Sequence, residues 1–89
     1  MRYTSISLEG HSRADKIEFA KEVNEQIANV LRKCPWLLND TSYKNIGMCT
    51  SKILRGENVP AVFVGIEMLE NFIARRKPNN SIVKSYLNR

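Results

Sequence analysis

One regular pattern, over residues 13–34, restricts the fold more than any other feature of the chain. Its apolar residues recur three or four positions apart, the spacing that places side chains on one face of an α-helix: Ile17, Ala20, Val23, Ile27, Val30, Leu31 and Cys34. Lysine and glutamate occupy much of the other face. A helix with one apolar face must bury that face, so we expect the rest of the chain to pack around it.

Both ends of this helix carry boundary signals. Ser12 can accept a hydrogen bond from the first turn, and Asp15, three residues later, places a negative charge where the helix dipole favours one. Pro35 cannot donate a backbone hydrogen bond and restricts the residue before it, so the helix should end there. The sequence therefore predicts a helix over residues 12–34. The apolar run Trp36–Leu38 is expected to pack beneath it.

The first ten residues alternate in polarity. One face of an extended segment would carry Thr4, Ile6 and Leu8, and the other would carry Tyr3, Ser5 and Ser7. Gly10 ends this pattern. Residues 1–10 are therefore expected to form a short edge strand or an extended arm.

The polar stretch after the apolar run predicts two short helices. Residues 39–42, Asn-Asp-Thr-Ser, all have side chains that can cap a helix, and Gly47 can end one. A second short helix is then expected over 48–55, closed by Gly56. The sequence thus predicts a helix-turn-helix-like unit over residues 39–56.

Residues 61–77 fit two kinds of secondary structure. Their apolar residues are spaced to line one face of a helix: Val62, Ile66, Leu69 and Ile73. The basic residues that follow favour a helix C-terminus. The segment 59–66, however, is rich in β-branched residues and contains a glycine, which is typical of a strand. The sequence favours a helix over 61–77, with a strand at 59–66 as the alternative.

These elements fit one domain, because a chain of 89 residues has room for one small core. After Pro78, a short helix over residues 81–87, capped by Ser81, completes the set. The expected fold class is mainly α: a single small helical domain over residues 1–89, with a helix-turn-helix-like core and a short N-terminal β-strand. An α+β fold with a second strand at 59–66 is the alternative.

Several classes of function lack the residues that they need. The sequence contains neither a signal-peptide pattern nor a run of about twenty apolar residues, so we expect a cytoplasmic protein without a membrane partner. With one histidine, His11, and with Cys34 and Cys49 outside any metal-ligand spacing, no metal or cofactor is expected. Both cysteines are interpreted as partly buried free thiols, with a disulfide as the alternative. No catalytic motif is present, so no enzyme activity is predicted, and His11 is expected in an exposed turn.

The charge is distributed unevenly along the chain. Residues 1–40 carry six basic and six acidic side chains, whereas residues 41–89 carry eight basic and three acidic ones, which accounts for the net charge of +5. Clustered lysine and arginine residues release counterions from nucleic acids, so this asymmetry favours a nucleic-acid-binding surface. A solvated basic face is the alternative.

The predicted helix over 48–55 separates two kinds of side chain. Cys49 and Ile53 would point to one side, and polar and basic residues to the other. Lysine and arginine can reach guanine acceptors or phosphates in the major groove, and serine can serve either. The candidate groove-binding residues are Lys44, Asn45, Met48, Ser51, Lys52 and Arg55. The candidates for phosphate contacts are Arg75, Arg76 and Lys77.

The stretch TSKILRGENVP, residues 50–60, followed by AVFVGIEMLENFI, resembles the helix-turn-helix DNA-binding proteins of the lambda-repressor and Cro type. The matching residues are Ser51, Lys52, Ile53, Arg55, Gly56 and Pro60, with Ile66 and Leu69 in the helix that would follow. The resemblance covers residues 50–73. It implies an all-helical, usually dimeric protein that binds operator DNA and regulates transcription, often in phages and mobile elements.

Two functions from different classes follow. The first is a small DNA-binding transcriptional regulator, of phage or mobile-element type, that inserts helix 48–55 in the major groove of double-stranded DNA and forms a homodimer. The second is a protein-interaction module, an inhibitor or adaptor, that docks helix 13–34 or the apolar segment 81–87 on a larger protein. The apolar density of CPWLL and AVFVGIEML motivates this second function.

Overall fold

The computed structural model describes residues 3–74 and 80–87. In chain order the elements are strand β1 (Tyr3–Ser7), helix α1 (Arg13–Lys33), the 3-10 helix η1 (Pro35–Asn39), helix α2 (Thr41–Leu54), strand β2 (Ala61–Gly65), helix α3 (Ile66–Ala74) and helix α4 (Ser81–Leu87). The fold class is mainly α with a short two-stranded sheet, which confirms the expected class.

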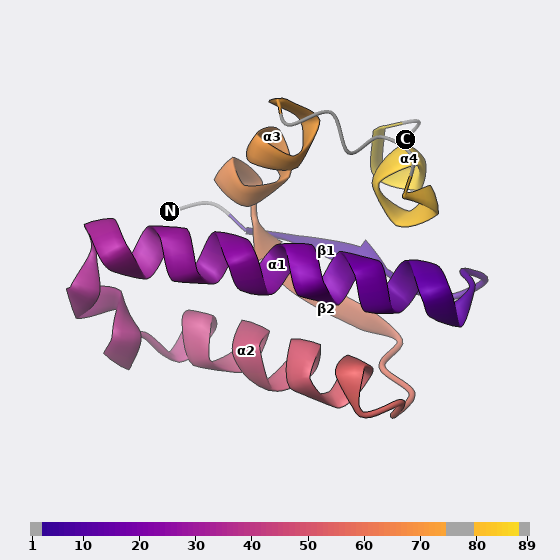
Figure 1. Cartoon of the computed structure of the whole chain (residues 1–89), viewed down its shortest axis with the longest axis horizontal. Helices are drawn as coiled ribbons and strands as arrows, with labels where there is room; N and C mark the ends of the chain where they lie inside the picture. Colours follow the sequence, from indigo (N-terminus) through magenta and orange to yellow (C-terminus); the bar gives the residue numbers. More distant parts are fainter. Residues whose placement is uncertain (1–2, 75–79, 88–89) are drawn as a thin grey trace.

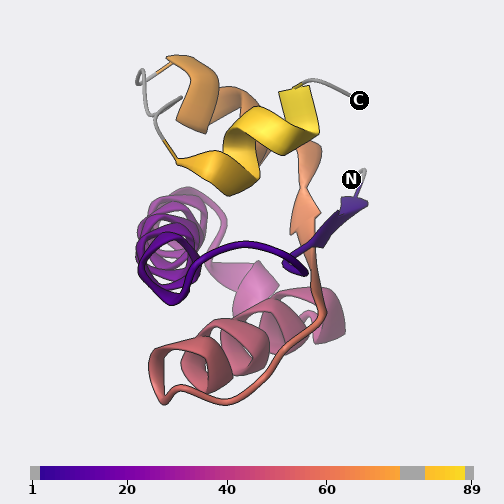
Figure 2. The same ribbon diagram turned by 90° about the vertical axis from the view of Figure 1, so that its right-hand side faces the viewer.

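Helix α1 is the central element of the molecule (Figure 1). Helix α2 runs along one side of α1, and α3 and α4 lie on the opposite side. Figure 2, turned by 90°, shows the sheet beside α1, between α2 on one side and α3 and α4 on the other. The core therefore forms where α1, the sheet and the flanking helices meet, and Phe19, Ala20 and Val23 of α1 are buried there.

The boundaries of α1 agree closely with the predicted helix over 12–34. The backbone N–H of Asp15 donates to Oγ of Ser12 at 3.1 Å, so the predicted cap is confirmed. At the other end, the backbone N–H of Cys34 closes the last turn on the carbonyl of Val30, and Pro35 begins η1. The start and stop of this helix are thus local properties of the sequence.

The segment from Ala61 corrects the preference for a helix over 61–77. Residues 61–65 form β2, antiparallel to β1, with Ile6 opposite Val62, and α3 begins only at Ile66. As the alternation predicts, Ile6 is buried, and so are Val62 opposite it and Val64 two residues further along β2, while Phe63 is exposed. A strand forms because β1 supplies a pairing edge and because alternate β-branched side chains fill the core.

A single helix, α2, replaces the two short helices predicted over 39–56. The turn expected at Gly47 does not form, although a mid-helix glycine costs about 0.5–1 kcal/mol relative to alanine. The buried residues of α2 continue at helical spacing on both sides of this glycine: Tyr43, Ile46, Thr50 and Ile53. The burial of these four side chains along one continuous helix face offsets this cost, so the helix-turn-helix-like arrangement is not formed. Similarly, Pro60 precedes a strand and not the helix that the resemblance implies.

Two further expectations need correction near the chain's turns. Helix α4 has the predicted bounds, but its cap is Asn80, whose Oδ1 accepts from the backbone N–H of Ile82 at 2.9 Å. His11 is half-buried instead of exposed, because its Nδ1 lies 2.8 Å from Oγ of Ser81.

The apolar run Trp36–Leu38 does not pack beneath α1 as a unit. Only Leu37 packs against the core, whereas Trp36 is 70% exposed and Leu38 63% exposed. A 3-10 helix has three residues per turn, so three successive side chains point in three directions and cannot share one buried face.

Candidate nucleic-acid interface

The candidate interface is the outward face of α2, and its position depends on how the helix starts. Oδ1 of Asp40 accepts hydrogen bonds from the backbone N–H groups of Ser42 and Tyr43, at 2.9 and 3.4 Å. The carboxylate of Asp40 thus occupies the free N–H groups of the first turn, so the N-terminus of α2 is not open to a phosphate. Any anion must therefore meet the side of the helix.

The end of α2 is equally well defined. The backbone N–H of Gly56 donates to the carbonyl of Ile53, and that of Glu57 donates to the carbonyl of Lys52, both at 3.0 Å. These two bonds form a Schellman motif, which requires a left-handed residue, and Gly56 has φ of +86°. The chain turns away after this point, so the outward side of the last turn is left uncovered.

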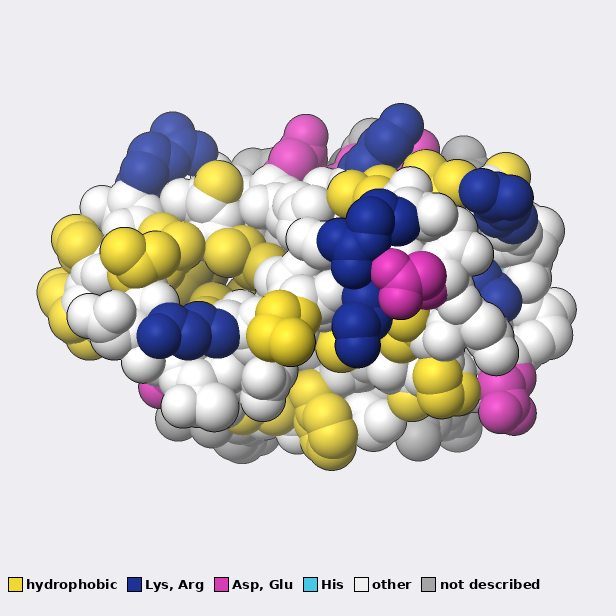
Figure 3. Space-filling model, turned by 90° about the horizontal axis from the view of Figure 1, so that it is seen from below, with side chains coloured by type: hydrophobic (Ala, Val, Ile, Leu, Met, Phe, Trp, Pro, Cys, Tyr) yellow, Lys and Arg dark blue, Asp and Glu magenta, His cyan; other side chains and the backbone are white. Residues whose placement is uncertain are grey.

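Between these two ends, one side of α2 is buried and the other faces solvent. The outward residues recur three or four positions apart and are exposed: Lys44, Met48, Ser51, Lys52 and Arg55. Together with Gly47 they line a shallow hollow of about 560 Å³. Figure 3 shows this side of the molecule, with lysine and arginine side chains interspersed with hydrophobic ones. We call these five residues the α2 stripe.

The charge of the α2 stripe is positive. Helix α2 contains three cations, Lys44, Lys52 and Arg55 at its C-cap, and no acidic residue between Thr41 and Leu54. One acid lies beside the stripe: Oε2 of Glu57 is 2.9 Å from Nε of Arg55. Both side chains of this ion pair are at least half exposed, so the pair is a weak surface contact that a stronger anion can replace.

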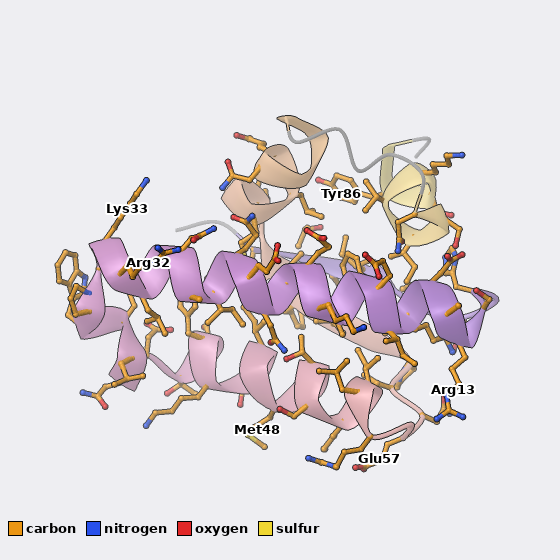
Figure 4. All side chains as sticks on the ribbon, in the orientation of Figure 1. Arg13, Arg32, Lys33, Met48, Glu57 and Tyr86 are labelled. Carbon is orange, nitrogen blue, oxygen red and sulfur yellow. The ribbon has the colours of Figure 1, made fainter. Side chains whose placement is uncertain are left out.

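Arg13 extends the basic surface beyond α2 and was not identified from the sequence. A Cβ added at Gly56 would lie 2.7 Å from Nη2 of Arg13, so this guanidinium sits against the end of α2. Figure 4 shows Arg13 and Glu57 at the same end of the molecule. No local pattern could have revealed this, because Arg13 and Gly56 belong to distant parts of the sequence.

The remaining candidates from the sequence do not join the stripe. Asn45 is exposed, but it lines a different hollow together with Tyr3, Ser42 and Phe63. Arg75, Arg76 and Lys77 lie outside the described residues. The structure thus gathers five of the six predicted groove residues on one face and separates Asn45 from them.

The surfaces named for protein interaction are mostly used within the domain. The apolar face of α1 is covered, and Ile82 and Val83 of α4 are buried. In the described part of the chain, large apolar side chains remain exposed on α2 (Met48 and Leu54), on β2 (Phe63) and at η1, where Trp36 and Leu38 are the two most exposed of their run. Arg32 and Lys33 lie at the end of α1 that η1 follows (Figure 4). We call Trp36 and Leu38 the η1 tip.

Other kinds of site find little support in the described part of the chain. Within residues 3–74 and 80–87, no group of three or more His, Cys, Asp or Glu side chains is placed to hold a metal ion. None of the helices described there combines the length and apolarity that crossing a bilayer requires. Cys34 and Cys49 are both free and half-buried, as expected.

The fold and the α2 stripe define a small, mainly helical domain with an exposed basic helix. No protein-family model matches the chain, and neither the curated proteins nor the solved structures include a significant match. The function must therefore be inferred from the geometry of the domain itself.

Proposed function

We propose that this protein is a small DNA-binding regulator that lays α2 in the major groove of double-stranded DNA. The observation that carries the proposal is the α2 stripe, in which three cations share one uncovered helix face with Met48 and Ser51. The major groove, about 12 Å wide, admits an α-helix presented in this way.

The length of the stripe suits a short DNA site. From Lys44 to Arg55 the helix rises by about 16 Å, at 1.5 Å per residue. Base pairs repeat every 3.4 Å along the duplex, so this length corresponds to about five base-pair steps. One copy of the domain would therefore read at most a half-site, and the proposal includes a homodimer on a longer operator.

Each residue of the stripe has a chemical role in this proposal. Lys52 and Arg55 donate to the O6 and N7 acceptors of guanine, and Ser51 can pair with any base edge. Met48 supplies an apolar contact for a thymine methyl group. Lys44, near the start of the helix, and Arg13, beyond its end, contact phosphates on either side of the groove. On binding, Arg55 leaves its ion pair with Glu57 and contacts the DNA instead.

A salt-dependent binding measurement tests this proposal. A fluorescent random duplex of about twenty base pairs is titrated with the protein at ~50 mM salt, where basic proteins bind most tightly, and again at higher salt. We expect Lys52→Ala/Arg55→Ala to weaken binding to this random duplex and to reduce the slope of log K against log salt by about 2, because two cations that displace counterions from DNA are removed.

The matched control is Lys21→Ala/Lys84→Ala, which removes two exposed cations from α1 and α4 and leaves α2 intact. It should retain most of the affinity. If the wild-type protein does not bind the duplex at low salt, or if both double variants lose affinity equally, α2 is not the DNA-binding helix.

A second candidate function rests on the η1 tip. Trp36 and Leu38 are the most exposed members of an apolar run, and large exposed apolar side chains mark contact sites for proteins. In this function the domain is an inhibitor or adaptor that inserts Trp36 in a pocket of a larger protein. Pull-down from nuclease-treated extract, with Trp36→Ser/Leu38→Ser as the bait for comparison, tests it. Equal recovery by both baits removes its support.

A further inference from the structure

We propose that the protein has a second binding site, a groove between β1 and α4 that takes up an extended peptide segment of a partner protein as a third strand of the sheet. This site is separate from the α2 stripe, because α4 and α2 lie on opposite sides of α1 (Figures 1 and 2). It does not depend on the proposed DNA binding.

The alternation of hydrogen-bonded and non-bonded residue pairs in the sheet shows which backbone groups of β1 face this groove. At the end of the ladder, the N–H of Leu8 donates to the carbonyl of Pro60 at 2.9 Å. Bonded pairs alternate with non-bonded pairs in an antiparallel sheet, so Ile6 also bonds to β2. The N–H and C=O groups of Ser5 and Ser7 therefore point away from β2. In the described part of the chain, β2 is the only strand beside β1.

Helix α4 forms the other wall of a groove along this edge. The groove measures about 430 Å³ and is lined by Ser5, Ile6 and Ser7 from β1 and by Ile82, Ser85 and Tyr86 from α4. Glu9 and His11 line it as well, beyond the end of β1. An edge strand flanked by a helix is the arrangement by which β-augmentation domains bind extended peptides, with main-chain bonds on one side and side-chain pockets on the other.

The walls indicate what kind of peptide fits. Residues opposite Ser5 and Ser7 would direct their side chains to the outer face of the sheet, where both serines are exposed and polar side chains are preferred. A residue opposite Ile6 would direct its side chain inward, toward Ile82, where an apolar side chain is preferred. Glu9 favours a basic residue at the end. The partner segment is therefore an extended, alternating polar–apolar peptide with a basic terminus.

The sequence of β1 also lacks the residues that usually prevent strand addition. Proteins protect such edges with lysine, proline or a β-bulge, and the strand Tyr3–Ser7 contains no charged residue and no proline. Its five pairs with β2 are in continuous register, without a bulge. The edge thus remains a suitable template for a further strand.

An NMR titration tests this site on the full chain. The probe is the peptide acetyl-Lys-Val-Thr-Val-Lys-amide, whose symmetric pattern fits the groove in either chain direction, added up to about 1 mM, a level that detects weak binding. We expect the amide resonances of Ser5 and Ser7 to shift progressively and their hydrogen exchange to slow several-fold. Amides of α2 should not change. The same peptide with methylated backbone nitrogens should leave all of these resonances unchanged.

Two variants connect the effect to the groove. Ser5→Pro removes an outward N–H without removing a bond to β2, as proline is tolerated at such edge positions, and should abolish the shift at Ser7. Ser85→Trp fills the groove from the exposed side of α4 and should also abolish binding, whereas Lys84→Trp, an exposed neighbour that does not line the groove, should not. Dispersed spectra establish that each variant is folded.

Three outcomes would overturn the proposal. The first is an absence of shifts at Ser5 and Ser7 with the wild-type protein. The second is equal binding of the methylated peptide, which would mean that main-chain pairing is not used. The third is a change of the same resonances with protein concentration alone, which would assign the edge to a second copy of the chain.

Discussion

Oγ1 of Thr50 on α2 lies 2.7 Å from Oδ1 of Asn24 on α1, and this hydrogen bond crosses the interface between the two longest helices. The hydroxyl is also 3.0 Å from the carbonyl of Gly47 on its own helix. Thr50 is only 1% exposed, so water cannot replace either contact. The bond therefore holds α2 in one rotational setting on α1, the setting that turns the α2 stripe outward.

Replacing this hydroxyl should destabilise the domain. Thr50→Val keeps the shape of the side chain but leaves Oδ1 of Asn24 without its donor, which costs about 1–2 kcal/mol of unfolding free energy. Urea denaturation measures the loss. Thr41→Val, the same change at an exposed position of α2, is the control and should have little effect. Equal losses in the two variants would show that the bond does not contribute.

The two glycines that bound the second half of α2 should respond in opposite ways to alanine. Gly47 is in the middle of the helix, and no atom lies within 4 Å of an added Cβ, so Gly47→Ala should stabilise the protein by about 0.5–1 kcal/mol. Gly56 has φ of +86° and an added Cβ would meet Arg13, so Gly56→Ala should destabilise it by at least about 1 kcal/mol. Thermal melting of both variants checks the signs, and a stabilising Gly56→Ala would contradict the left-handed cap.

Removing the acid beside Arg55 should strengthen DNA binding. Glu57→Gln releases the guanidinium from its 2.9 Å contact and removes a negative charge from the interface. Because exposed ion pairs contribute about 0–1 kcal/mol, we expect affinity to rise by roughly two- to fivefold at low salt. Glu18→Gln, on the exposed side of α1, changes the net charge equally and serves as the control. An equal gain in both variants would assign the effect to net charge.

One hydroxyl should contribute measurably to the attachment of α4. Oγ of Ser81 donates to Oδ2 of Asp15 at 2.6 Å and lies 2.8 Å from Nδ1 of His11, so it joins α4 to the start of α1. Ser81→Ala should cost about 1–2 kcal/mol and accelerate hydrogen exchange in α4 before the rest of the chain. Ser85→Ala, exposed on the same helix, is the control and should leave the exchange rates of α4 unchanged.

Some elements of this fold could be predicted because their causes are local. Ser12 caps α1 through its own side chain, and Pro35 ends the helix through its own ring. The alternation that places Ile6 and Leu8 on one face of the first segment is likewise a property of a single stretch of chain. Neither feature requires knowledge of any distant residue.

Other elements depended on contacts between distant segments. The residues after Pro60 fit both helical and strand spacing, and pairing with β1, more than fifty positions earlier, selected the strand. Gly47 suggested a turn. The helix continues through it because residues on both sides are buried, Tyr43 and Ile46 before it and Thr50 and Ile53 after it. At Gly47 the packing free energy exceeded a local cost of about 1 kcal/mol, whereas at residues 61–65 strand pairing selected one of two structures that the local sequence allows.

The candidate surfaces show the same division. The sequence by itself determined which residues are basic, where the long amphipathic helix begins and ends, and that Ile53 and the cations of its segment lie on opposite faces. Only the tertiary structure decided that these cations remain uncovered, that Asn45 turns toward another hollow, and that Arg13 joins the end of α2. The physical reason is that a helix or strand specifies its own faces through its periodicity, whereas the face that meets solvent is chosen by the packing of the whole chain.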